Sequence, residues 1–103
     1  MKGLAYTELR RNAEAEHFNR RALELVPDHS ETLNNQGVVF SQSSDRAEEA
    51  LHFFERATRF NPLHAQALGN QVRVLRGMQR HDEADEREAA SRELQSKMQT
   101  ESL

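Results

Sequence analysis

The sequence predicts an all-α protein, an α-solenoid of stacked antiparallel helix hairpins with about six helices. With only four glycines and two prolines in 103 residues, little interrupts helix along the chain. The chain also repeats at a spacing of 35 residues. The matching pairs are Ala15 with Ala50, Phe18 with Phe53, Ala22 with Ala57, Leu25 with Phe60, and Pro27 with Pro62. A period between about 20 and 50 residues is typical of stacked repeats, because each unit is too short to bury its own apolar face.

The composition narrows the classes of protein. Charged residues make up 30% of the chain and hydrophobic residues 36%, which suits stacked hairpins that bury one stripe each. The net charge of −3 argues against a general nucleic-acid surface. The chain has no cysteine, and its sequence contains no apolar run of membrane-spanning length and no signal-peptide pattern. We therefore expect a cytoplasmic protein without membrane contact.

The first unit is expected to contain helices at about 2–10 and 12–25. The second carries the apolar stripe of Ala15, Phe18, Ala22 and Leu25 and stops at Pro27. Asp28 and Glu31 then form a capping pair for the next helix.

The middle unit is expected to contain helices at about 29–42 and 45–60. Leu33, Gln36, Gly37 and Phe40 share one face of the first helix. Asp45 with Glu48 predicts a capping box for the second, and Asn61-Pro62 ends it.

The last unit is expected to contain helices at about 64–78 and 81–98. The first of them carries an apolar stripe of Leu68, Val72, Leu75 and Met78, and Gly77 weakens the helix near its end. The final helix is polar over residues 86–93, which suits the outer face of a terminal repeat.

These residues resemble the tetratricopeptide repeat (TPR) family, whose pattern is W-x2-L-G-x2-Y, then A-x3-F, then P. The middle unit matches it with Leu33, Gly37, Phe40, Ala50, Phe54 and Pro62. The first unit supplies Gly3, Tyr6, Ala15 and Pro27, with Tyr6 expected in the core. The third keeps Leu68, Gln71, Leu75 and Ala84. The resemblance implies a right-handed superhelical array in a single domain, 1–98, with repeats at about 1–27, 28–62 and 63–96 and a disordered tail over 99–103.

Two departures from the pattern are informative. Gly37 and Ala50 are 13 residues apart, whereas the equivalent pairs in the other units are 12 apart, so one extra residue should bulge near Ser43-Ser44-Asp45. The helix expected at about 2–10 has only about two turns, and isolated helices this short are marginal in water. We therefore expect the first repeat to be truncated at its amino end.

No catalytic, cofactor or metal chemistry is expected. His17 and His52, like His29 and His64, are 35 residues apart and therefore recur at equivalent positions in different repeats. Neighbouring helix axes lie about 8–10 Å apart, too far for two such histidines to share a metal ion. The acidic clusters fall in first helical turns or on outer faces, and no phosphate loop is present. The sequence therefore predicts no enzyme.

A binding face follows from the resemblance, because TPR proteins hold extended peptides on the concave face of their first helices. Asn35 and Asn70 recur at one position, and an amide can pair with a peptide backbone of any sequence. Arg73, Arg76 and Arg80 add a basic edge suited to carboxylates. The candidate peptide-binding residues are Glu31, Asn34, Asn35, Val38, Gln66, Asn70, Arg73 and Arg76, with Ser41, Gln42, Gly69 and Gly77 on the same face.

Two functions from different classes are open. In the first, the chain is a protein-protein interaction module that binds a peptide or segment of another protein. In the second, it is a structural or self-assembly module, or a part of a larger TPR array, that self-associates through its incomplete first repeat. RNA binding is disfavoured by the negative charge and by the lack of stacking aromatics on the inner face.

Overall fold

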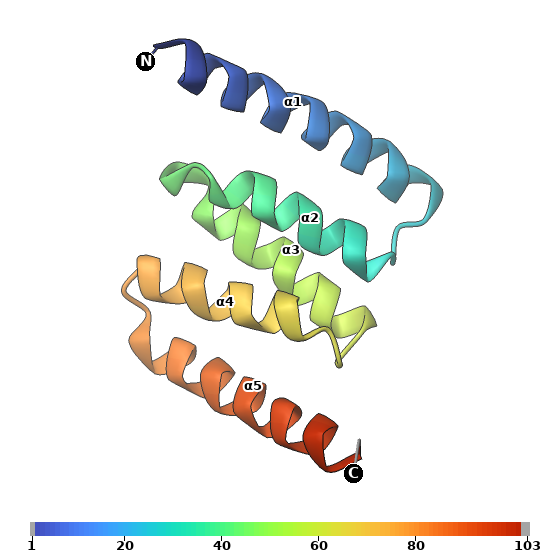
Figure 1. The fold of residues 1–103 in the computed structure, drawn as a ribbon, viewed down its shortest axis with the longest axis vertical. Helices are drawn as coiled ribbons and strands as arrows, with labels where there is room; N and C mark the ends of the chain where they lie inside the picture. Colours follow the sequence, from blue (N-terminus) through green and yellow to red (C-terminus); the bar gives the residue numbers. More distant parts are fainter. Residues whose placement is uncertain (1, 102–103) are drawn as a thin grey trace.

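The structure, a computed structural model, describes residues 2–101, with side chains described for residues 10–97. Its helices are α1 (Lys2–Leu25), α2 (Ser30–Ser41), α3 (Ala47–Phe60), α4 (Ala65–Gly77) and α5 (His81–Glu101), with a short 3-10 helix, η1, at Ser44–Arg46. This part of the chain contains no strand, so the all-α prediction is confirmed. Successive helices run antiparallel, and α1 and α5 lie at opposite ends of the long axis (Figure 1).

The prediction of six helices is wrong for the first unit. The expected helices 2–10 and 12–25 form one straight helix, α1, so five α-helices make up the described part. The expected turn has no glycine or proline between Leu9 and Ala13 to break the helix. An i,i+4 ion pair between Arg10 and Glu14, 3.8 Å apart, instead spans that point and favours continued helix.

The core lies between α2, α3, α4 and α5. Ala50, Ala57 and Ala84 have no exposed surface, and Phe54 is 1% exposed, as the repeat pattern predicted for core positions. α1 packs against α2, α2 also contacts α4, and each later helix packs against the next. α1 therefore lies at the edge of the stack with one helix beside it (Figure 1).

Gly37 allows a close approach between α2 and α3. A Cβ atom built on Gly37 would lie 2.5 Å from Cε1 of Phe54, well inside van der Waals contact. The absence of a side chain at Gly37 therefore lets the Phe54 ring lie directly against α2.

The helix caps differ from the predicted ones. His29 is the N-cap of α2, where its Nδ1 accepts a hydrogen bond from the Thr32 N–H, and His64 caps α4 in the same way through the Ala67 N–H. The predicted role of Asp28 as a cap is therefore wrong, because the histidine one residue later reaches the free backbone amide. The two histidines do occupy equivalent positions, as their spacing predicted.

The Asp45 capping box is also wrong. The extra residue of the middle unit is taken up by η1, which is followed directly by α3, and the cap position is Arg46 without a side-chain cap. The bulge expected near Ser43-Ser44-Asp45 is thus a single tight turn.

α4 ends in a Schellman motif just beyond Gly77. The Arg80 N–H donates to the Leu75 carbonyl and the Gln79 N–H to the Arg76 carbonyl. Gln79 takes the left-handed position, with φ 61°, where glycine is the usual residue. α5 then continues to Glu101, into the segment predicted to be a tail.

Two equivalent glutamines behave differently. Gln71 is 1% exposed, and its amide donates to the Phe54 carbonyl at 3.1 Å and to Thr58 Oγ1 at 3.0 Å, which joins α4 to α3. Gln36 is 3% exposed, and its Oε1 is buried without a hydrogen-bond partner. The residue 35 before Thr58 is Leu23, so the side-chain acceptor that Gln71 Nε2 uses in the later unit is absent for Gln36.

Several residues of the predicted apolar stripes lie at the surface. Phe18 is 69% exposed, Leu25 84% and Phe60 50%. The first two belong to α1, which lacks the second neighbour that a core helix would have. Tyr6, expected in the core, lies outside the described side chains. Within residues 2–101, no helix is long and apolar enough to cross a membrane.

Candidate functional site

A groove runs between α2 and α4, at the face where the sequence placed a peptide site. Its volume is about 530 Å³. The residues that line it are Asn34, Asn35, Val38, Gln66, Gly69, Asn70 and Arg73. All seven belong to the predicted binding face, so α2 and α4 bring most of that face together. We call this the α2/α4 groove.

The three asparagines of the groove have different roles. Asn34 is only 4% exposed, and its Oδ1 accepts a hydrogen bond of 3.0 Å from Nδ2 of Asn70. This bond links α2 to α4 and uses part of the hydrogen-bonding capacity of Asn70. Asn35 is exposed, and its amide has no hydrogen bond to any other described group. Asn35 therefore offers a free donor and a free acceptor in the groove.

Only one of the three predicted arginines leaves its guanidinium free. Arg76 Nη2 pairs with Asp85 of α5 at 3.2 Å and also with Glu88. Arg80 pairs with Glu83 at 2.7 Å and with Glu48 at 3.3 Å. Arg73 is exposed in the groove and makes no ion pair with the described side chains.

The pKa shifts are consistent with Arg76 and Arg80 being paired with carboxylates. The hydrogen bond to Glu88 is the main cause that raises the pKa of Arg76, and the hydrogen bond to Glu83 does the same for Arg80. In turn, the hydrogen bond from Arg80 lowers the pKa of Glu83. These guanidiniums already have carboxylate partners, so Arg73 is the cation that remains available to a ligand.

Two predicted residues lie outside the groove lining. Glu31 is exposed in the first turn of α2, and Arg76 faces the carboxylates of α5. Ser41, Gln42 and Gly77 line a second hollow of about 370 Å³, which shares Arg73 with the groove. Its apolar lining comes from Ala47, Val74 and Met78.

Sequence reasoning missed two features of this site. Nothing in the 35-residue period indicated that Asn34, rather than a ligand, would pair with Asn70. The apolar hollow beyond Arg73 was also missed, because Ala47, at the start of α3, and Val74, in α4, lie outside the predicted apolar stripes. Together the two hollows form an extended track with a polar half, a central arginine and a more apolar half.

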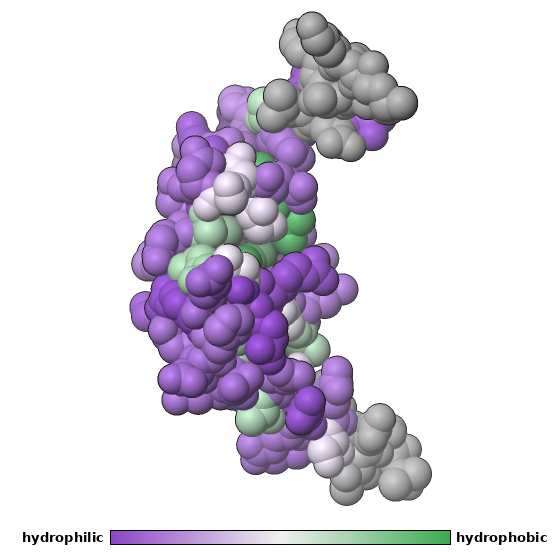
Figure 2. Space-filling view, turned by 90° about the vertical axis from the view of Figure 1, so that its left-hand side faces the viewer, coloured by the Kyte–Doolittle hydropathy of each residue, from purple (hydrophilic) through white to green (hydrophobic). Residues whose placement is uncertain are grey.

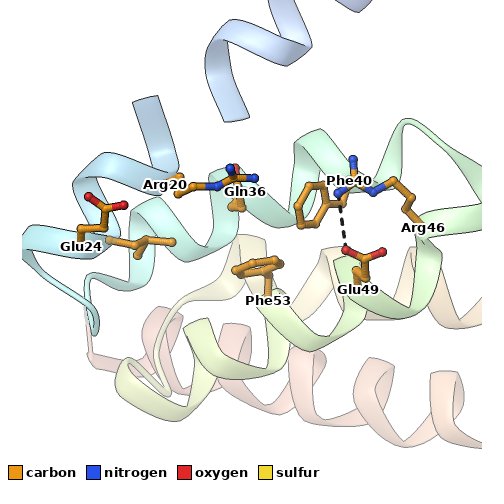
Figure 3. A pocket seen from close by; sticks show the side chains of 8 residues that line it. Arg20, Glu24, Gln36, Phe40, Arg46, Glu49 and Phe53 are labelled. Atoms are coloured by element: carbon orange, nitrogen blue, oxygen red, sulfur yellow. Dashed lines mark hydrogen bonds and ion pairs between the residues drawn. The ribbon is translucent and has the colours of Figure 1, made fainter. Parts of the chain in front are cut away.

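A third hollow, between α1, α2 and α3, is a weaker candidate (Figure 3). Phe40 and Phe53 line it, and the Arg46 guanidinium covers the Phe40 ring at 3.8 Å. Arg46 itself pairs with Glu49 at 3.5 Å and Glu16 at 3.6 Å. Although Gln36 lines this hollow, its unpartnered Oε1 has no accessible surface. Charged groups at this hollow are thus largely paired within the chain.

Most of the surface in Figure 2 is hydrophilic, with apolar patches near the middle of the molecule. Within the described part, no group of three or more metal-binding side chains could hold a metal ion. No protein-family model matches this chain, and no curated protein matches it.

Proposed function

We propose that this chain is a TPR-like helical-repeat module that binds an extended segment of another protein in the α2/α4 groove. The observation that carries the proposal is the free amide of Asn35 beside the unpaired guanidinium of Arg73 in one groove. The 35-residue period and the antiparallel order of the helices support the repeat architecture.

Asn35 would hold the backbone of the ligand. Its side chain can accept from a peptide N–H and donate to a peptide carbonyl at once, so it binds an extended chain with little regard to sequence. The Asn34–Asn70 hydrogen bond would fix the groove floor and the relative position of α2 and α4. A preorganised groove of this kind loses little conformational entropy on binding.

Arg73 would select an acidic side chain in the ligand. It lies where the polar groove meets the more apolar hollow of Ala47, Val74 and Met78. The ligand is therefore expected to carry one acidic residue flanked on one side by an apolar residue. Because the arginine is exposed, its contribution should weaken as salt rises.

The experiment is a selection from a library of random decapeptides, followed by affinity measurements on the enriched peptides. Selected peptides should contain one Asp or Glu beside an apolar residue. Asn35→Ala should weaken binding by about 0.5–1.5 kcal/mol, or roughly 2- to 12-fold in Kd. Arg73→Ala should weaken binding and remove most of its salt dependence.

The matched control is Arg59→Ala on α3, an exposed arginine without an ion pair to any described residue. It should leave both affinity and salt dependence unchanged. Asn70→Ala is not a clean probe, because it also leaves the buried Asn34 amide without its partner. Equal binding by the parent and by the double variant Asn35→Ala/Arg73→Ala would contradict the proposal.

A further inference from the structure

The second surface of interest is a stripe on α1, well apart from the groove. Phe18 is 69% exposed and Leu25 84%, while Ala15 and Ala22 beside them are half-buried. Residues three, four and seven apart lie on one side of a helix, so these four form a continuous apolar line. We call it the α1 stripe.

The repeat shows how the same residues are arranged when they are covered. In α3, 35 residues further on, Ala50 and Ala57 are fully buried. Phe53, the equivalent of Phe18, is half-buried with its ring 5.2 Å from that of Phe40. α3 packs against both α2 and α4, whereas α1 packs along α2 and otherwise reaches η1 through the Glu16–Arg46 ion pair. The α1 stripe therefore resembles in composition the stripe of α3, which two helices cover, although only one helix packs along α1.

The charges beside the stripe suit an antiparallel copy of α1. Glu14 and Arg21 lie on the same flank of Phe18, four residues before it and three after. In an antiparallel pair of such helices, Glu14 of each copy faces Arg21 of the other. Arg21 makes no ion pair among the described side chains, and Glu14 stays 62% exposed despite its contact with Arg10. On the other flank, Ala15 faces Ala22 and allows close approach.

We propose that the α1 stripe binds the α1 stripe of a second copy, antiparallel, with the two-fold axis close to Phe18. The interface is self-complementary, with Phe18 on Phe18 and two Glu14–Arg21 pairs, as a two-fold dimer requires. Residues 11–25 make a contact about 22 Å long. A contact between two single helices of this length buries less area than a standard interface of about 1,600 Å², so the dimer is weak and depends on concentration. It does not depend on the proposed peptide groove.

The test is sedimentation equilibrium from low micromolar to near-millimolar protein. The parent should rise from the monomer mass of 11.9 kDa toward twice that value. Phe18→Glu places two carboxylates face to face and should stay at the monomer mass throughout. Its control is Leu63→Glu, a similarly exposed position at 67%, which should dimerise like the parent.

A charge exchange tests the antiparallel register. Glu14→Arg and Arg21→Glu each create like-charge contacts when the variant is alone, so each should be monomeric. Mixed together, the two variants form heterodimers in which every Glu14–Arg21 contact again joins opposite charges, and the dimer mass should return. Far-UV circular dichroism would confirm that each variant is folded.

Four results would overturn the proposal. A parent that remains a monomer at all concentrations has no such interface. A dimer that survives Phe18→Glu uses another surface. A mixture of the charge variants that stays monomeric excludes the antiparallel register, and a stable complex with a different protein at Phe18 would identify another occupant.

Discussion

At the scale of single residues, two glycines in neighbouring repeats show how differently the same residue type is used. Gly37 lies against the buried Phe54 ring, where a Cβ would be 2.5 Å from the nearest ring atom. Gly69 is exposed on α4, and a Cβ there would meet nothing within 4 Å. One glycine is required by packing, and the other only weakens its helix.

The pair Gly37→Ala and Gly69→Ala should therefore have opposite effects on stability. Replacing glycine by alanine inside a helix ordinarily gains about 1 kcal/mol, which Gly69→Ala should show. At Gly37 the overpacking costs about 1–3 kcal/mol and should leave a net loss of about 1 kcal/mol. Urea unfolding of the two variants and the parent measures the change in the free energy of unfolding that each substitution causes. A stabilising Gly37→Ala would mean that Phe54 is not held against α2.

A second residue-scale difference concerns hydrogen bonds. The Gln71 amide is satisfied across α3 and α4, while the Oε1 of Gln36 is buried alone. A lost hydrogen bond that leaves a buried group unpaired costs about 1–3 kcal/mol, whereas removing an already unpaired group costs little.

Gln71→Met should accordingly destabilise the protein by about 0.5–1.5 kcal/mol for each hydrogen bond lost, because the side-chain bonds from Gln71 to the Phe54 carbonyl and to Thr58 disappear. Gln36→Met, a change of the same size in the equivalent position, should be neutral or stabilising. Thermal and urea unfolding compare the two. Equal losses at both positions would show that Gln36 has a partner of its own, such as an ordered water.

At the scale of helices, the 35-residue period predicted the second and third units well. The expected boundaries 45–60 and 64–78 compare with Ala47–Phe60 and Ala65–Gly77. Apolar stripes and prolines mark these elements directly. The helix break at about residue 11 was expected only by analogy with the other units, since no breaker residue stands there, and the chain continues as α1. The Asn34–Asn70 bond was not predictable, because it depends on the distance between α2 and α4.

The turn between α4 and α5 is held by charge. Arg80 binds Glu83 through two nitrogens, Nε at 2.8 Å and Nη2 at 2.7 Å, and this contact lowers the pKa of the Glu83 carboxyl. A carboxyl whose pKa is lower in the folded state stabilises the fold at pH values above its ordinary pKa. That contribution is lost as the pH falls through the folded-state value.

Glu83→Gln should thus lower the urea midpoint at pH 7 and have less effect at acidic pH, where the parent carboxyl is protonated. The exposed position of the pair makes the effect small. Glu86→Gln, three residues along α5 and without an ion pair to the described residues, is the control and should not shift the midpoint. A Glu83→Gln effect that is equal at both pH values would rule out the ion pair as its cause.

At the scale of the whole molecule, the helices differ in how many neighbours support them. α2 packs against α1, α3 and α4, whereas each end helix packs along one α-helix, α1 along α2 and α5 along α4. In stacked helical proteins stability is close to a sum of neighbour terms, so the two end helices, α1 and α5, should open before α3.

Hydrogen exchange on dilute protein should therefore show faster exchange of the α1 amides than of those in α3. At high concentration, protection should rise over residues 11–25, where the second copy is proposed to bind. Protection of α1 equal to that of α3 in a dilute monomer would contradict the edge position of α1.

The ion pairs of Arg76 have a consequence for ligand choice. Asp85 and Glu88 are tethered to the same chain, so they compete for this guanidinium at an effective concentration that a free ligand rarely reaches. If the groove binds acidic peptides as proposed, Asp85 and Glu88 of α5 would keep Arg76 from contributing to that binding. A ligand with two acidic residues should therefore bind only slightly more tightly than a ligand with one. The preference for peptides with one acidic residue rather than two would thus depend on α5, a helix that contributes no residue to the groove.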